Sequence, residues 1–352
     1  MDGRMLGIVS TALKSNFGKL PEPYKLNFSV TYNCQSRCLT CNIWQMRPKG
    51  ELSLDEIRQF AAKNTSFRWI ELTGGEVFLR SDIDEIARAF NESCTGLYIL
   101  TMPTNSLCNP ALVRKKLESI LSLGIPRIMI TLSLDGYREL HDRIRGVPGN
   151  YDKVIAMARM LQEMKKEHRT LGFVFGYTMS KMNQGELGKT IEAVMGDVPG
   201  ITYNDFHVNL SQISGNYYSN TDLDIRADGR KAAEEVRFLL SRRAFSPDPM
   251  QIVESAFLRN LVKYAETGVQ PMSSRSGEAS VFLDSFGNVY PSIMWDKKLG
   301  NVRETQYSLS PVLGGEAAME VRERIRNKTE PVQWTSCEAY QTLLGNVASI
   351  IA

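Results

Sequence analysis

The stretch Cys34-Gln-Ser-Arg-Cys38-Leu-Thr-Cys41 sets the expectations for the whole chain. It follows an apparent strand and places three thiols within eight residues. Thiolates are the usual ligands of a [4Fe-4S] cluster, and a cluster held by only three of them keeps one iron open to an outside molecule. The spacing therefore predicts a redox cluster with an open coordination position.

The same cysteine loop could instead have a structural role. The thiols could pack as small apolar groups, but the polar neighbours Asn33, Gln35 and Arg37 do not resemble a core face. A structural zinc site usually takes four ligands in two Cys-x-x-Cys pairs, and the sequence has no second pair. A disulfide framework is unusual in a chain of 352 residues without a secretory signal. Zinc is the strongest of these alternatives.

Patterns of alternating apolar residues and helical periodicity recur along the first two thirds of the chain. A capping box at Ser53 and Glu56 opens the first helix of this series, and Ser81 with Asp84 opens the second. Strands are expected at residues 24–32, 67–72, 97–102, 127–133, 171–178 and 201–210, and the helices between them at about 54–61, 81–90, 110–123, 151–166 and 184–195.

Strands that alternate with helices predict parallel pairing with right-handed crossovers. Six repeats are too few for a closed eight-stranded barrel, so the expected fold is α/β, a partial (β/α)6 barrel of the TIM type. In such barrels the reactive groups lie at the carboxyl ends of the strands, which is where the cysteine loop falls.

The Cys-x-x-x-Cys-x-x-Cys pattern after a first strand resembles the signature of the radical S-adenosylmethionine (radical SAM) superfamily. The resemblance implies that Cys34, Cys38 and Cys41 hold a [4Fe-4S] cluster whose open iron binds the amino and carboxylate groups of SAM. It also implies that an electron from the cluster splits SAM into methionine and a 5'-deoxyadenosyl radical, which takes a hydrogen atom from a substrate.

Further motifs at the expected strand ends extend this resemblance. Thr73-Gly74-Gly75-Glu76 is similar to the family's Gly-Gly-Glu motif, which assigns Gly74, Gly75 and Glu76 to the SAM amino group. Asn105, after the third strand, is expected near SAM.

The segment from Ser133 to Gly146 is similar to a Ser-x-Asp-Gly…His-Asp-x-x-Arg-Gly run of the larger enzymes in the family. The match implies that Ser133 faces the SAM ribose or carboxylate and that Arg145 pairs with the carboxylate. Asp135 and His141 could serve either a local loop network or catalysis. Leu39 stands where the family often has an aromatic residue near the adenine.

Four side chains near the ends of the fifth and sixth strands are candidates for substrate contact or proton transfer. They are Lys181, His207, Tyr217 and Tyr218.

The last part of the chain contains a hairpin signal at residues 280–291, and its layout looks like the SPASM/twitch extension of many radical SAM enzymes. That extension holds auxiliary clusters with several cysteines, but here Ser292 follows the hairpin proline and Cys337 is the only cysteine of the region. We therefore expect a small α+β twitch-like domain without an auxiliary cluster, in which Cys337 is a packed thiol. A redox-neutral reaction such as epimerisation is then favoured.

These assignments divide the chain into four segments. An amphipathic helix at 1–23 precedes the radical SAM barrel at 24–215, a helical linker at 216–270 and the twitch-like domain at 271–352. The apolar run of the first segment is too short for a signal peptide or a membrane span.

A net charge of +3 gives no reason to expect a nucleic-acid partner, and the use of six cysteines fits a reducing cytoplasm. The expected partners are SAM, an electron donor such as flavodoxin or ferredoxin, and a substrate of unknown class: a peptide side chain, a sugar or nucleotide derivative, or a lipid headgroup. The alternative function is a non-catalytic module, either zinc-binding or partner-recruiting, on a degenerate barrel.

Overall fold

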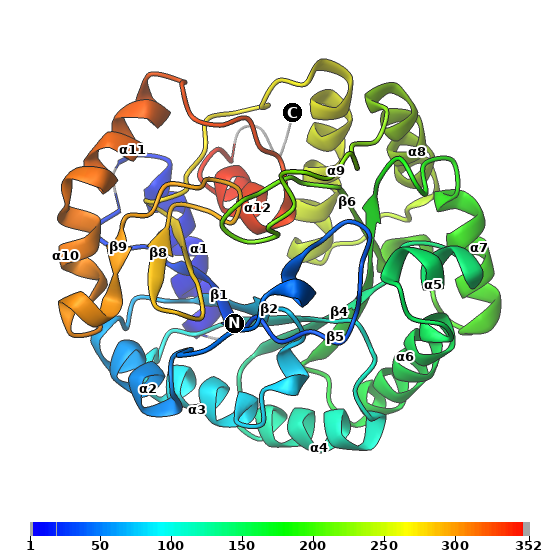
Figure 1. The fold of residues 1–352 in the computed structure, drawn as a ribbon, viewed down its shortest axis with the longest axis horizontal. Helices are drawn as coiled ribbons and strands as arrows, with labels where there is room; N and C mark the ends of the chain where they lie inside the picture. Colours follow the sequence, from blue (N-terminus) through cyan, green and yellow to red (C-terminus); the bar gives the residue numbers. More distant parts are fainter. Residues whose placement is uncertain (1–2, 19, 348–352) are drawn as a thin grey trace.

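The computed structural model describes residues 3–18 and 20–347, which contain one nine-stranded sheet in the order β6-β5-β4-β3-β2-β1-β7-β8-β9. The first six strands pair in parallel with their neighbours and form an arc (Figure 1). These strands are β1 (Lys25–Thr31), β2 (Trp69–Gly74), β3 (Ile99–Thr104), β4 (Arg127–Ser133), β5 (Leu171–Met179) and β6 (Phe206–Leu210).

Helices cover the outer face of this arc (Figure 1). Apolar side chains from the helices and the strands share one core. The segments with a strand period therefore form the sheet, and the segments with a helical period form the layer of helices outside it. The partial (β/α)6 barrel is thereby confirmed. The covering helices are α2 (Leu54–Lys63), α3 (Ile83–Ser93), α4 (Pro110–Leu121), α6 (Asn150–Glu167), α7 (Leu187–Asp197) and α8 (Gly229–Arg242). Helix α9 (Pro249–Thr267) packs against α8, β6 and α12 at the end of the arc.

Local signals predicted some element ends correctly and others wrongly. The capping box of Ser53 and Glu56 is present at the start of α2. Helix α3, however, has Asp82 as its N-cap residue, without a side-chain capping bond, rather than Ser81. The strand expected at 201–210 is shorter, because Thr202 caps a 3-10 turn at Tyr203–Asp205 before β6 begins.

Three helices have no clear signal in the sequence: α5 (Glu139–Arg145), α10 (Leu309–Gly314) and α12 (Ser336–Leu344). The first two have only seven and six residues, too few to show a helical period. Helix α12 buries Glu338, Gln341 and Thr342 together with apolar residues, so its buried face does not read as hydrophobic.

The predicted hairpin is confirmed as β7 (Ser280–Leu283) and β8 (Asn288–Tyr290), joined at Gly287 with φ +86°. Strand β7 pairs in parallel with β1, and β9 (Gly300–Asn301) and α11 (Glu316–Arg326) follow. The hairpin thus extends the barrel sheet beyond β1 instead of forming a sheet of its own.

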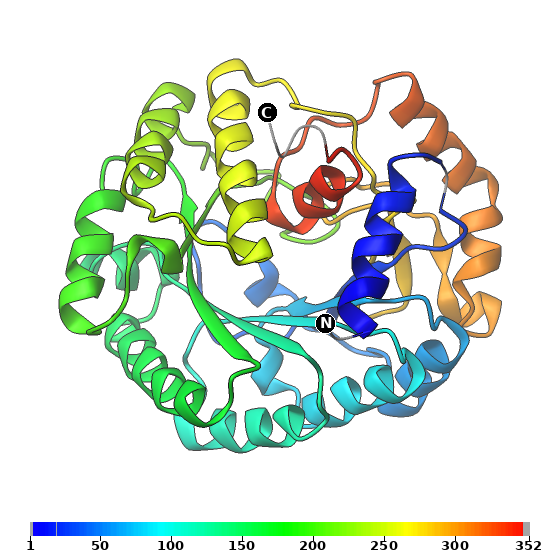
Figure 2. The ribbon, with the colours of Figure 1, turned by 180° about the vertical axis from the view of Figure 1, so that it is seen from behind.

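Helix α12 bridges the two ends of the six-stranded arc. At β6, the Ser336 amide donates to Asn209 Oδ1 over 3.1 Å. At β1, Lys25 Nζ donates to the Cys337 carbonyl over 2.6 Å, and Asn27 Nδ2 donates to Glu338 Oε1 over 3.2 Å. Figure 2 shows α12 on the side of the barrel that no strand of the arc closes.

Helix α1 (Gly3–Ser15) packs against the same body through Ile8, which lies in a small apolar cluster with Trp69 and Ile99. In the described ranges no helix combines the length and the apolar character needed to cross a membrane.

The end of β2 approaches the cysteine loop very closely. Gly75 N donates to the Thr31 carbonyl and Glu76 N to the Asn33 carbonyl, each over 2.8 Å. A Cβ on Gly74 would lie 2.1 Å from the Thr31 carbonyl oxygen, and the residue has φ +133°. Only glycine tolerates both conditions.

Replacing Gly74 by alanine should therefore destabilise the protein by about 2 kcal/mol or more, because backbone must shift and a side chain must adopt a strained φ. Urea denaturation measures this change. Gly314→Ala is the matched control, since its Cβ would meet nothing within 4 Å, and it should stay within about 1 kcal/mol of wild type. Equal effects of the two substitutions would contradict this account.

The buried carboxyl group of Glu338 should make the stability of the protein depend on pH. Burial raises its pKa from 4.5 to about 7, although Lys25 and Ser276 act in the opposite direction. The pKa of Glu338 in the folded state lies above that in the unfolded state. The protonated carboxyl group therefore contributes fully to the free energy of unfolding below about pH 4.5, and this contribution is lost as the pH rises through about 7. The free energy of unfolding of Glu338→Gln should fall less steeply over this range than that of wild type. Glu316→Gln, on the exposed start of α11, should keep the wild-type slope.

Candidate active site

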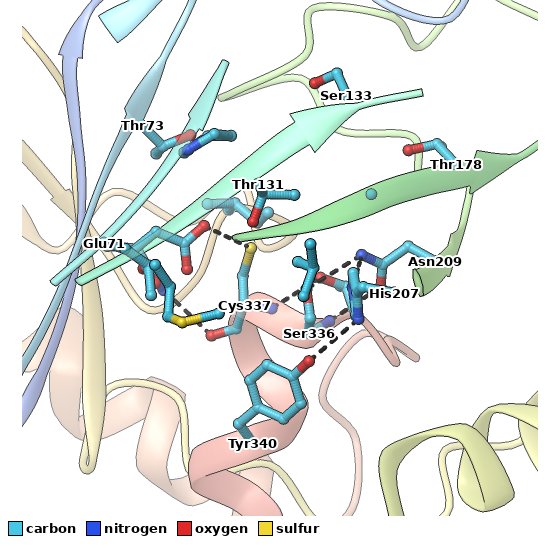
Figure 3. Close-up of a pocket in the computed structure, with 18 of the residues that line it drawn as sticks. Glu71, Thr73, Thr131, Ser133, Thr178, His207, Asn209, Ser336, Cys337 and Tyr340 are labelled. Carbon is cyan, nitrogen blue, oxygen red and sulfur yellow. Dashed lines mark hydrogen bonds between the residues drawn. The ribbon is translucent and has the colours of Figure 1, made fainter. Parts of the chain in front are cut away.

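The inside of the barrel contains a cavity of about 560 Å³. The cysteine loop, strands β1 to β6, helix α12 and part of α1 contribute to its lining. Figure 3 shows that side chains from β2, β4, β5, β6 and α12 converge on it. Its size is typical of sites for small molecules and cofactors.

Cys34, Cys38 and Cys41 all line this cavity. Each sulfur has an N–H group beside it: Asn105 Nδ2 is 3.7 Å from Cys34 Sγ, Arg145 Nη1 is 3.8 Å from Cys38 Sγ, and the Ile43 amide is 3.4 Å from Cys41 Sγ. Hydrogen bonds of this kind stabilise the charge on cluster thiolates. The donor set therefore fits an iron-sulfur cluster.

Burial raises the pKa of the Cys34 thiol to about 11 and that of Cys41 to about 12. Burial also raises the pKa of Cys38, against the opposing effect of Arg145. The thiols are therefore protonated at neutral pH until a metal replaces the protons. Within residues 3–18 and 20–347, no three His, Cys, Asp or Glu side chains are grouped so that they could hold a single metal ion.

Arg145 and Asp135 form a buried ion pair at the same rim, with 2.7 Å between Nε and Oδ2. Asp135 Oδ1 also accepts from the Thr178 amide, so the carboxylate orients the guanidinium from one side. His141 is buried away from the cavity, and its Nδ1 accepts from the Asp135 amide over 3.0 Å. His141 therefore stabilises the loop at Asp135 and does not reach the cavity as a catalytic group would.

Glu76 lies fully buried and does not line the cavity. Its carboxylate accepts from the amides of Asn105 and Phe78, over 2.7 and 3.2 Å, and from Thr104 Oγ1 over 2.9 Å. Burial raises the pKa of Glu76 to about 7. The carboxylate thereby fixes the end of β3, from which Asn105 reaches Cys34.

The remaining residues predicted from the sequence divide into two groups. Leu39, with 47% of its surface exposed, and Lys181, which pairs with Asp224, lie outside the cavity. The residues that line the cavity are Gly74, Gly75, Asn105, Ser133, Arg145, His207, Tyr217 and Tyr218.

Tyr217 connects two parts of the rim. Its hydroxyl lies 2.8 Å from Thr73 Oγ1 and donates to the Gly74 carbonyl over 3.1 Å. Its ring contacts Tyr218 edge to face at 4.7 Å between centroids. Tyr217 therefore braces the glycine turn from the loop after β6.

Cys337 packs against the apolar cluster that contains Tyr217 and Phe282, and it also faces the cavity, which the sequence did not predict. Its sulfur lines the cavity and donates to Glu71 Oε1 over 3.4 Å, as Figure 3 shows. Lys25 Nζ lies 3.9 Å from the other oxygen of Glu71. The thiol reaches this position because α12 fills the gap between β6 and β1, which the sequence pattern did not reveal.

Sequence reasoning also missed several lining residues. Glu71 and Asn209 stand two positions from Thr73 and His207 on the same strands, so the period of two could have identified them. Ser336 and Tyr340 carried no such signal, because they lie on the unpredicted α12.

The curated proteins that resemble this chain in sequence include two from different organisms. The AdoMet-dependent heme synthase of Methanosarcina barkeri is 30% identical over 175 residues, which cover 48% of this chain and 46% of that protein. AlbA of Bacillus subtilis, an antilisterial bacteriocin subtilosin biosynthesis protein, is 21% identical over 305 residues, or 84% of this chain and 61% of that protein. The chain thus spans about half to three fifths of the length of these two relatives.

Among solved structures, SuiB of Streptococcus suis bound to S-adenosylmethionine matches with a TM-score of 0.61. The match covers 86% of this chain and 68% of that chain, at 16% identity, and is therefore a likeness of fold. The family model of the Radical SAM superfamily matches residues 28–194, the segment that carries the cysteine loop, the glycine turn and Arg145. This chain therefore contains a radical SAM superfamily domain.

Proposed function

We propose that this protein is a radical SAM enzyme that takes a hydrogen atom from an organic substrate inside the barrel. The observation that carries the proposal is the convergence of three thiols, each beside an N–H donor, on one cavity. Radical SAM enzymes use a [4Fe-4S] cluster and SAM, which together supply a 5'-deoxyadenosyl radical.

The residues of this chain take the following roles in the proposal. Cys34, Cys38 and Cys41 hold the cluster. Arg145, already oriented by Asp135, binds the SAM carboxylate, because a guanidinium matches both oxygens of a carboxylate. Gly74 and Gly75 leave room for close approach of the SAM amino group to backbone.

Four further residues complete the proposed site. Glu76 acts through the backbone that it fixes rather than by direct contact. Asn105 supports the first cysteine, and Ser133 faces the ribose or carboxylate. Leu39 stands beside the second cysteine, where it is available to the adenine.

In this proposal the C-terminal region is a twitch-like domain without an auxiliary cluster. Serines before and after the hairpin are engaged with other side chains: Ser274 Oγ donates to Ser276 Oγ over 2.7 Å, and Ser292 Oγ donates to Gln333 Oε1 over 2.9 Å. A single-cluster enzyme needs an external electron donor such as flavodoxin or ferredoxin, and a redox-neutral reaction is favoured. The AdoMet-dependent heme synthase and AlbA have names that point to different products, so the two names do not indicate one substrate class for this chain.

Anaerobic reconstitution with iron and sulfide tests the proposed function. Wild type should bind about four irons, as one [4Fe-4S] cluster requires, and release 5'-deoxyadenosine from SAM after addition of dithionite. Cys38→Ala should abolish both, since two thiolates cannot hold the cluster.

Cys94→Ala is the control for this experiment, because Cys94 is buried in the core away from the cavity. It should keep the iron and the SAM cleavage. About eight irons would contradict the single-cluster assignment. Tight zinc without cleavage would instead favour the non-catalytic metal-binding module.

Arg145 supplies a second test. Arg145→Lys should weaken SAM binding by about tenfold, because an ammonium cannot bind a carboxylate in the two-pronged manner of a guanidinium. Calorimetric titration of the reconstituted protein with SAM measures the change. Arg143→Lys, on the exposed side of α5, should bind SAM as wild type does, and equal affinities of both variants would refute the role of Arg145.

A further inference from the structure

The charges around the cavity restrict what can enter it. Of the described residues that line the cavity, only Arg127 and Arg145 are permanently cationic. Arg127 donates from both Nη atoms to Asp248 over 2.8 to 2.9 Å, and Arg145 pairs with Asp135. Because Arg145 is also the proposed partner of the SAM carboxylate, neither guanidinium remains available to a charged group of the substrate.

Among the described residues, three carboxylates line the cavity, against two cations: Glu71, Asp135 and Glu254 are the carboxylates. Glu71 contacts the Cys337 thiol and Lys25, while Glu254 accepts from His207 Nδ1 over 2.9 Å. A phosphate or carboxylate group placed beside them would lose its hydration and meet like charge. The inner cavity is therefore unfavourable for anionic groups.

The polar groups that do remain available are hydroxyls. Thr101 Oγ1 is buried without a partner. Thr131, Ser133 and Thr178 line the cavity from β4 and β5, and Figure 3 shows no hydrogen bond from them to the other residues drawn. A hydroxyl can both donate and accept, so this wall suits a ligand with several uncharged polar groups.

The adjoining wall, formed by β6 and α12, is held by hydrogen bonds between its side chains. The Ser336 amide donates to Asn209 Oδ1, which turns Asn209 Nδ2 toward His207 Nε2 at 2.7 Å. The Tyr340 hydroxyl donates to Glu254, so the carboxylate that orients His207 is itself fixed. The side chains of this wall are thus held in place by one another, and the carboxylate of Glu254 is already paired with His207 and Tyr340.

We propose that the part of the substrate that enters the barrel is uncharged and carries hydroxyl or amide groups, which bind the hydroxyls of Thr101, Thr131 and Thr178. This inference rests on the proposed function and names its substrate class. Peptide amides and sugar hydroxyls share this chemistry. Nucleotide phosphates and polycarboxylates are excluded from the inner cavity.

Matched pairs of small probes test the inference. N-acetylserine amide is compared with its phosphoserine counterpart, and methyl glucoside with its 6-phosphate, on the reconstituted protein with SAM bound. Binding is followed by tryptophan fluorescence, because Trp44 and Trp69 line the cavity. At least one uncharged probe should bind about tenfold or more tightly than its phosphorylated partner.

Tighter binding of N-acetylserine amide would indicate a peptide substrate, and tighter binding of methyl glucoside would indicate a sugar substrate. The paired substitution Thr131→Val with Thr178→Val should weaken binding of the tighter probe by about fivefold per hydroxyl, since shape is kept and hydrogen bonds are lost. Thr170→Val, on the exposed turn before β5, is the matched control and should not change binding.

Equal or tighter binding of the phosphorylated probes, or no binding of either uncharged probe, would overturn the inference. SAM cleavage with dithionite is measured on the same preparation. The cleavage assay decides the proposed function and the titration decides the substrate class, so the two failures are distinguishable.

Discussion

Six parallel strands do not close into a barrel, and the rest of this structure depends on how the remaining opening is covered. Helix α12 does this by bonding to β6 through Ser336 and to β1 through Cys337 and Glu338. A covering helix that packed only apolar side chains would leave the inside of the barrel apolar. Because α12 instead brings polar groups, its inner face becomes a wall of the cavity.

The same constraint explains the buried charges. Lys25, Glu71 and Glu338 lie on or beside β1, β2 and α12, where burial without partners would cost several kcal/mol for each ion. Hydrogen bonds from Ser276, Ser280 and Gln341 to Glu338 offset that cost. Polar contacts thus accompany the apolar packing of Ala339 and Leu343 at the opening, and the cavity lies between α12 and the cysteine loop.

Sequence reasoning predicted the arc and its rim well, because these depend on local signals. Apolar periods identified all six strands of the arc, and the close spacing of Cys34, Cys38 and Cys41 brings them to one cavity regardless of distant contacts. It predicted α12 poorly, since a helix that buries Glu338 and Gln341 has no apolar stripe. The contact of Cys337 with the cavity was missed for the same reason.

The sequence by itself determined the strand order within the arc, the cysteine loop and the glycine turn, because each is specified by residues close together in the chain. Only the tertiary structure decided that Glu76 is buried behind the cavity lining at Thr104 and Asn105, that β7 joins the barrel sheet, and that α12 lines the same cavity as the cysteines. The last two features depend on pairings between segments far apart in the chain. Such pairings are chosen by the fit of whole surfaces and the balance of buried charge, which no short pattern encodes.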